Sequence, residues 1–198
     1  MTPATATRPP PGRPRDPRID AAVRRAVVDL LPATGYEGLT VAAVADRAGT
    51  TKPAVYRRWP TKAQLVHEAV FPSGEETLVP DGDDLVVDLR AMVAASAALF
   101  GRPEVRAAVP GLLAAFAADP GTHAELRGRV AVPAGAGLRA RIERAVAEGA
   151  ARPGVAADVL LDVIGGATLM ALALRPGRAL DDRWVDDVVD LLTGGLVP

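Results

Sequence analysis

Three threonines, Thr40, Thr51 and Thr61, each precede a short segment in which apolar residues recur at helical spacing. A threonine in this place can accept a hydrogen bond from an N–H of the first helical turn, so each is a predicted N-cap. Thr61 and Gln64 also have the spacing of a capping box. The letters AGTT, which contain the helix-stopping Gly49, separate the first two segments. Two short helices joined by such a turn predict a helix-turn-helix.

A longer helix precedes these three. Its apolar stripe consists of Ile19, Ala22, Val23, Ala26, Val27, Leu30 and Leu31. Pro32 is expected to disturb the last turn and Gly35 to end the helix with a left-handed cap. In the short helices, the expected inward residues are Val41, Val44, Ala45 and Ala48, then Val55 and Trp59, then Leu65, Val66, Ala69 and Val70. The third helix is expected to run from Thr51 to about Trp59.

The composition favours an all-α fold. Hydrophobic residues make up 49% of the 198 residues, aromatic residues only 4%, and alternating strand patterns are missing. The chain has no cysteine, which excludes a disulfide framework. The longest apolar run, Val163–Leu174, is too short to cross a bilayer, and the first residues do not resemble a signal peptide. We therefore expect a cytoplasmic protein with no membrane partner.

Charge and composition divide the chain into four parts. Residues 1–17 are rich in Arg and Pro and are expected to be a disordered arm. Residues 18–71 contain the helix-turn-helix, residues 72–82 are a predicted linker, and residues 83–198 form a larger helical body. Residues 1–70 carry eleven Lys/Arg and six Asp/Glu, net +5, whereas residues 71–198 are net −6. We call residues 18–71 the head and residues 83–198 the body. A basic head on an acidic body favours a polyanionic partner for the head.

The side chains expected to point away from the apolar face of the third helix suit nucleic acid. They are Thr51, Lys52, Ala54, Tyr56, Arg57 and Arg58, a set of hydroxyls, cations and a small methyl that can contact phosphates and base edges. Lys52 and Lys62 are the only lysines in the chain. Each follows a capping threonine, where the free amides of a helix N-terminus favour a phosphate. Together these features predict DNA binding.

The segment GYEGLTVAAVADRAGTTKPAVYRRWPTKAQLV, residues 35–66, resembles the DNA-binding region of the TetR family of transcriptional regulators. The resemblance implies that the helix beginning after Thr51 is the recognition helix in the major groove. It implies phosphate contacts by Thr40, Thr51, Tyr56 and Lys62, and places Lys52, Pro53, Ala54 and Arg57 near base edges or the adjoining backbone. Arg8, Arg13 and Arg15 of the arm could enter a neighbouring minor groove or belong to a solubilising tail.

The resemblance also implies a body that dimerises and binds a small effector. The dimer is expected to use the apolar helix Asp158–Leu174 and the closing helix Asp181–Thr193, and to bind a near-palindromic operator. Candidate effector contacts are Met92, Phe100, Leu112 and Phe116, which could equally be core residues; an effector would then be apolar or amphipathic. A ligand-responsive repressor is expected, and no cofactor or metal.

Two other classes remain open at this point. An enzyme would have to bring together His67, His123, Ser73 and Ser96, which are far apart in the sequence. A protein-interaction module could keep the helix-turn-helix for protein contacts, although the basic head argues against that. We expect a DNA-binding regulator and no enzyme.

Overall fold

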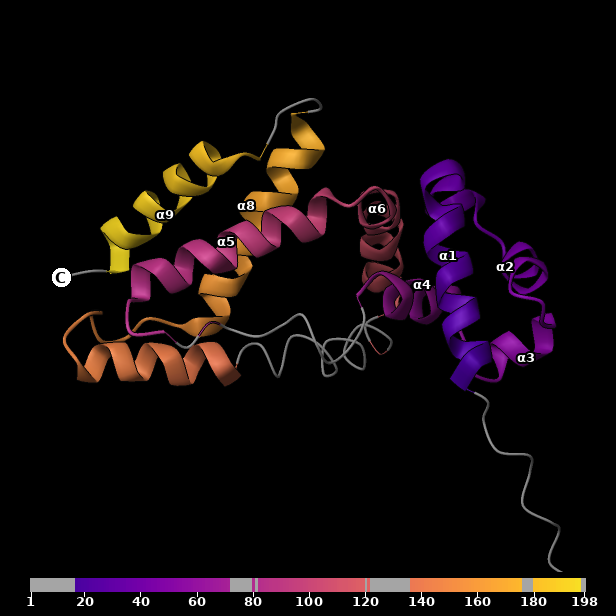
Figure 1. Ribbon diagram of the computed structural model, residues 1–198, viewed down its shortest axis with the longest axis horizontal. Coiled ribbons are helices and arrows are strands. Elements are labelled where there is room, and N and C mark those ends of the chain that lie inside the picture. The colour runs from indigo at the N-terminus through magenta and orange to yellow at the C-terminus, as the bar shows by residue number, and fades with distance from the viewer. Residues whose placement is uncertain are drawn as a thin grey trace, which may run out of the picture.

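The computed structural model describes residues 17–71, 80, 82–119, 121, 136–175 and 180–196. These residues form helices and connecting turns, with no strand among them. The helices are α1 (Pro17–Gly38), α2 (Val41–Arg47), α3 (Lys52–Tyr56), α4 (Lys62–Val70), α5 (Leu85–Gly101), α6 (Pro103–Ala118), α8 (Ala157–Leu174) and α9 (Asp182–Leu196). Residues 136–147 form a further helix, between α6 and α8 in the chain. The predicted all-α fold is confirmed (Figure 1).

Helix α1 runs through Pro32, which lies on its exposed side. The regular backbone is interrupted three residues later, at Gly35, whose φ of 64° only glycine adopts readily. Gly35 therefore ends the long straight part of α1 as expected, with one further helical turn to Gly38.

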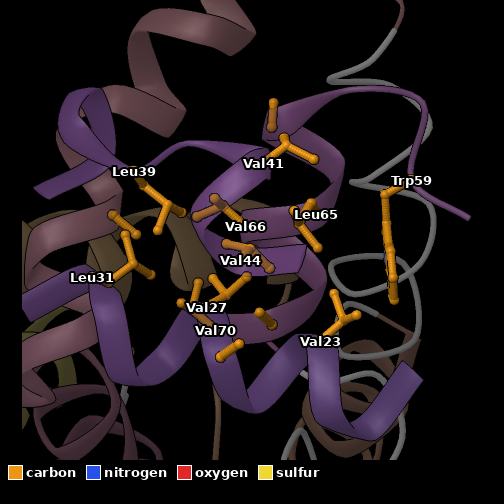
Figure 2. Close-up of a cluster of buried hydrophobic side chains, with 14 of the residues drawn as sticks. Val23, Val27, Leu31, Leu39, Val41, Val44, Trp59, Leu65, Val66 and Val70 are labelled. Carbon is orange, nitrogen blue, oxygen red and sulfur yellow. The ribbon is translucent and has the colours of Figure 1, made fainter. Parts of the chain in front are cut away.

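The first core joins α1, α2, α3 and α4. The predicted inward residues Val23, Val27 and Leu31 of α1 are fully buried, and Val44 and Val66 meet them from α2 and α4. Figure 2 shows these side chains converging between the helices. This core fixes the orientation of the short helices, because α2 and α3 are too short to be stable alone.

Helix α6 belongs to this same core, although it lies within the predicted body. Val105, Ala108, Val109 and Leu112 are buried in the cluster formed by the head helices. α6 packs against both α1 and α4, and Figure 1 shows it between the head on one side and α5 on the other. It is thus the direct structural link from the body to the head.

The second core lies among α5, α8, α9 and the helix of residues 136–147. Leu89 and Val93 of α5 are fully buried there, with Leu138 and Trp184 packed in the same cluster. The core also contains a buried ion pair, in which Arg141 Nε donates to Asp88 Oδ2 at 2.5 Å. Thr168 of α8 is also buried, and its hydroxyl accepts from the Ser96 hydroxyl at 3.0 Å.

Helix α8 exposes one apolar stripe. Val159, Val163, Met170 and Leu174 are large, exposed and spaced so that they share one side of the helix. One chain leaves this stripe uncovered, so α8 is not the fully buried central helix of a monomer. By length and composition alone, α8 is long and apolar enough to cross a membrane. The apolar run counted from the sequence, Val163–Leu174, is shorter and did not indicate this. The core helix of a soluble protein passes the same criteria.

Three predicted features lie partly or wholly outside the described residues. They are the arm with Arg8, Arg13 and Arg15, most of the linker 72–82, and the segment containing His123. α1 begins at Pro17, the last residue assigned to the arm.

Candidate nucleic-acid interface

The three threonines cap the three short helices. Thr40 Oγ1 accepts from the Ala43 N–H at 3.1 Å, and Thr51 Oγ1 accepts from the Ala54 N–H at 3.3 Å. Thr61 forms the complete capping box: its Oγ1 accepts from Gln64 N–H at 3.1 Å, and its own N–H donates to Gln64 Oε1 at 3.2 Å. In each of these bonds the threonine Oγ1 is the acceptor. A threonine that also contacts a phosphate therefore donates its hydroxyl proton to a phosphate oxygen.

The turn between α2 and α3 is tightly closed. Gly49 has a φ of 64°, and the Thr50 N–H donates to Ala45 O at 2.9 Å. Because a side chain at Gly49 would be strained at this φ, the glycine fixes the angle at which α3 leaves α2. The two helices therefore form the predicted helix-turn-helix.

Helix α3 is shorter than predicted: it ends at Tyr56, not near Trp59. Two turn residues follow, and Trp59 comes after them, with its N–H still donating to Val55 O at 3.0 Å. Val55 and Trp59 are both buried, as expected. The indole Nε1–H donates to Glu68 Oε2 at 2.7 Å, so Trp59 anchors the end of α3 to α4.

The exposed face of α3 contains most of the predicted contact residues. Lys52, Pro53, Tyr56 and Arg57 are exposed, and Ala54 is half-buried. The Lys52 ammonium lies 5.8 Å from the centre of the Tyr56 ring, so the two side chains share one side of the helix. Tyr56 is 42% exposed, and a tyrosine hydroxyl can hydrogen-bond a phosphate oxygen.

Arg58 does not belong to this exposed face, so its assignment from the sequence was wrong. Its guanidinium forms an ion pair with Asp20 of α1, and Nη1 donates to Ala54 O at 3.1 Å. Only 8% of the Arg58 side chain is exposed. Arg58 therefore holds α3 against the start of α1 and is not available to DNA.

Lys62 lies apart from the α3 residues, beside the end of α1. Its Nζ lies 4.5 Å from the centre of the Tyr36 ring and donates to Glu37 O at 3.2 Å. Burial raises the pKa of the Tyr36 hydroxyl above its usual value, and the charge of Glu37 adds to the effect. Sequence reasoning missed Tyr36, because nothing within its own segment indicates that it lies beneath a lysine.

One further head contact was not foreseen. The Arg47 guanidinium donates to Asp29 Oδ2 from Nη2 at 2.8 Å and from Nε at 3.2 Å, joining the end of α2 to α1. Both side chains are about half exposed, so this pair contributes little stability but does occupy Arg47.

Comparison with known proteins agrees with this geometry. The model for bacterial regulatory proteins of the tetR family matches residues 23–69, and the model for the tetracyclin repressor-like C-terminal domain matches residues 79–192. The second match alone covers more than half of the chain. The chain belongs to the tetR family.

Individual members of the tetR family are similar to the chain over most of its length. It is 28% identical to the HTH-type transcriptional regulator YdeS of Bacillus subtilis, over 90% of this chain and 89% of that protein. It is also 28% identical to the DNA-binding transcriptional repressor TetR of Mycobacteroides abscessus, over 86% and 89%. Among solved structures, the TetR family transcription regulator SCO0332 is 32% identical, with a TM-score of 0.68 over 91% of this chain and all of that one.

Membership in the tetR family makes the chain a helix-turn-helix transcriptional regulator, as predicted from the sequence. The family assignment concerns the whole chain and leaves the individual contact residues as predictions. Of these, Thr51, Lys52, Pro53, Ala54, Tyr56 and Arg57 lie together around α3, whereas Thr40 and Lys62 lie at the starts of α2 and α4.

Proposed function

We propose that the protein is a dimeric, ligand-responsive repressor that binds a near-palindromic operator through α3. The observation that carries the proposal is the exposed face of α3, where Lys52, Tyr56 and Arg57 stand free of the core that holds Val55 and Trp59. A helix anchored on one side and cationic on the other is suited to the major groove, where side chains reach base edges.

The proposed phosphate contacts frame this helix. Thr40, Thr51 and Lys62 stand at the N-termini of α2, α3 and α4, where free amides and the helix dipole favour an anion. Lys62 would exchange its contact with Glu37 O for a phosphate oxygen, because a charged acceptor outcompetes a backbone carbonyl. Lys52, Pro53, Ala54 and Arg57 are proposed to lie at or near base edges.

The exposed stripe on α8 supports the dimer. Val159, Val163 and Met170 would be covered by the same stripe of a second copy, which a two-fold axis brings face to face. A Cβ added at Gly166, within this stripe, would meet nothing within 4 Å in one chain. The space above Gly166 therefore suits the close approach of a partner helix. Leu191 of α9 is a further large apolar side chain exposed in one chain, and we propose that it also lies in the dimer interface.

Two comparisons support the remaining parts of the proposal. The relative in Mycobacteroides abscessus is named a repressor. A transcriptional regulator from Saccharomonospora viridis with the same fold, 14% identical and with a TM-score of 0.68, was solved in complex with choline. We propose that this chain likewise binds a small molecule in its body, and that it acts in the cytoplasm, where its operator is.

The proposal is one of binding and not of catalysis. Two of the residues considered for an enzyme have structural roles: the Ser96 hydroxyl donates to Thr168 Oγ1 at 3.0 Å, and the His67 ring packs 5.3 Å from that of Phe71. Ser73 and His123 lie outside the described residues.

Of the four candidate effector contacts, Phe100 lines a cavity among the described residues. Met92 packs against the second core, Leu112 is buried in the first core, and Phe116 packs against that core.

Selection of bound duplexes from a random DNA library tests the function directly. The purified full chain should enrich one sequence with two related half-sites about one helical turn apart, at centre-to-centre spacing of about 10 base pairs. Enrichment of no sequence, with the protein folded and dimeric, would contradict the proposal. Enrichment of a single unrepeated half-site would retain DNA binding but contradict the dimer.

A further inference from the structure

The Lys62 side chain is held at two points, although it stands at the start of a helix. Its Nζ donates to Glu37 O at 3.2 Å and lies 4.5 Å from the centre of the Tyr36 ring. The residue is half-buried. Lys52 is exposed, and its Nζ lies farther, 5.8 Å, from the ring of Tyr56 on the same helix. The contact of Lys62 therefore depends on the fold, whereas that of Lys52 is local.

The position of the Tyr36 ring is set by the body helix α6. A Cβ on Gly111 would lie 2.1 Å from Tyr36 Cδ1 and 2.3 Å from Tyr36 Cγ, so the ring packs directly against the backbone of α6. Tyr36 is half-buried and packs against the first core. A ring fixed in this way offers a cation a π face whose position does not change.

The end of α1 provides the second attachment of Lys62. Glu37 lies in the last turn of α1, where backbone carbonyls have no helical partner and carry partial negative charge. This turn contains no basic residue of its own, and Lys62, 25 residues later, supplies the cation. The bond to Glu37 O takes one of the N–H donors that a phosphate would use. The ring attracts the whole ammonium charge and needs no particular N–H.

We propose that Tyr36 is a positioning residue for DNA binding, whose ring holds the Lys62 ammonium ready for a backbone phosphate. On binding, Nζ exchanges Glu37 O for a phosphate oxygen and keeps its place over the ring. Lysine carries its charge on a flexible four-carbon stem, and ordering that stem on DNA costs conformational entropy. The ring restricts the stem before DNA binds and so reduces this cost. The inference rests on the proposed function, because Lys62 is a phosphate contact only there.

A double-mutant cycle on DNA affinity tests this role, with the full chain and the duplex obtained by selection. Tyr36→Leu removes the ring and should weaken binding about three- to tenfold, between the values of an exposed and a desolvated cation–π contact. In the Lys62→Ala background the same change should alter affinity by less than about twofold, because no ammonium is left to position. An equal loss in both backgrounds would mean that Tyr36 acts only through the fold, and would overturn the proposal.

Two further variants separate the ring from the core. Tyr36→Phe keeps the ring face and should bind DNA within about twofold of wild type, because phenylalanine also attracts a cation. Phe116→Leu is the matched control, since it removes another aromatic ring that packs against the same core, beside His67. It should leave DNA affinity as it is in wild type. A loss in Tyr36→Phe or in Phe116→Leu as large as that in Tyr36→Leu would contradict the positioning role.

Nuclear magnetic resonance of isotope-labelled lysine tests the contact in the wild-type chain, whatever the stability of Tyr36→Leu. Lys52 and Lys62 are the only lysines, so two ε-methylene signals are expected, and Lys62→Ala assigns them. Protons above an aromatic face are shifted upfield by the ring current. The Lys62 signal should therefore lie upfield of that of Lys52, and should stay upfield when DNA is bound. A Lys62 signal at the position of a free lysine, with or without DNA, would overturn the proposal.

The same measurements distinguish failure of this inference from failure of the proposed function. A folded wild-type chain that binds no duplex contradicts the proposed function itself. If wild type binds DNA and Lys62→Ala binds it equally well, Lys62 contacts no phosphate. The positioning role of Tyr36 is then wrong, and the regulator function stands.

Discussion

Tyr36 lies so close to Gly111 that a Cβ built on this glycine would come within 2.1 Å of Tyr36 Cδ1. Tyr36 belongs to the last turn of α1, and Gly111 follows Pro110 in α6. Lys62 Nζ lies over the same tyrosine ring, 4.5 Å from its centre. One aromatic side chain thus joins the body helix α6 to a residue proposed to hold DNA.

The closeness of this contact predicts the effect of Gly111→Ala. Alanine would favour the helical conformation by about 1 kcal/mol. Its methyl would, however, also lie 2.6 Å from Tyr36 Cβ, an atom that rotation of the ring does not move. We expect a net loss of about 1–3 kcal/mol in the free energy of unfolding, as in other overpacked cores. Denaturant unfolding measures it. Gly101→Ala is the control: its methyl would meet nothing within 4 Å, so this variant should be as stable as wild type or more so.

The raised pKa of Tyr36 predicts a loss of stability at alkaline pH. Burial favours the protonated hydroxyl, so the folded pKa lies above the unfolded value of 10.0. The stability that the protonated Tyr36 hydroxyl contributes to the folded chain is therefore fully present below pH 10. It is lost as the pH rises through the folded pKa. In Tyr56→Phe, Tyr36 is the only tyrosine left, and its phenolate absorbance should appear above pH 10. A midpoint at or below 10 would mean that the ring is not held against α6.

Arg57 and Arg58 are adjacent but are predicted to act differently. Arg58→Gln breaks the partly buried pair with Asp20 and should cost about 2 kcal/mol of unfolding free energy, less than a fully buried pair, since 27% of Asp20 is exposed. Arg57→Gln should leave stability within about 0.5 kcal/mol, as for most exposed substitutions, and should weaken DNA binding. Paired melting and DNA titration separate the two roles. Equal effects on stability would contradict the assignment of Arg58.

The dimer proposal predicts that a charge on the exposed apolar surface yields monomers. Leu191 is 79% exposed on α9, so Leu191→Glu should not disturb the fold of one chain but should disfavour association. Analytical ultracentrifugation measures the mass. Leu113→Glu changes a leucine that is 52% exposed on α6, a helix outside the proposed interface, and this variant should remain dimeric. A Leu191→Glu dimer as stable as wild type would contradict this interface.

Local features were the ones that the sequence predicted best. The caps at Thr40, Thr51 and Thr61 each need only a side chain and an N–H two or three residues away, so their geometry is contained in the segment itself. The buried positions of α1 and α4 followed from spacing for the same reason.

Contacts between distant segments were not predictable in this way. The sequence around Arg58 indicates an exposed cation, because its ion-pair partner Asp20 lies 38 residues earlier in the chain. From the sequence alone, Gly111 is a residue that destabilises its helix. The structure shows that Tyr36 packs directly against it. Similarly, an apolar stripe on α6 shows that the helix is buried but not that it is buried against the head.

The proposed phosphate contacts of Tyr56 on α3 and of Lys62 at the start of α4 predict general losses of affinity. Tyr56→Ala and Lys62→Ala should weaken binding to all duplexes by similar factors, because phosphates carry no sequence information. Lys52→Ala, in contrast, should change which duplex is preferred. Repeating the DNA selection with each variant distinguishes these outcomes, and full retention of affinity in all three would mean that another surface binds DNA.

The salt dependence of operator affinity tests the DNA-binding face of α3 most directly. The doubly substituted Lys52→Ala/Arg57→Ala chain is compared with wild type and with Arg139→Ala, an exposed arginine of the body. Lys52 and Arg57 are proposed to lie at base edges or the adjoining backbone, and each of the two that contacts a phosphate should contribute about one unit to the slope of log affinity against log salt. The double variant should therefore show a shallower slope and weaker binding. Arg139→Ala should match wild type. A double variant with the affinity and slope of the wild-type protein would contradict the account.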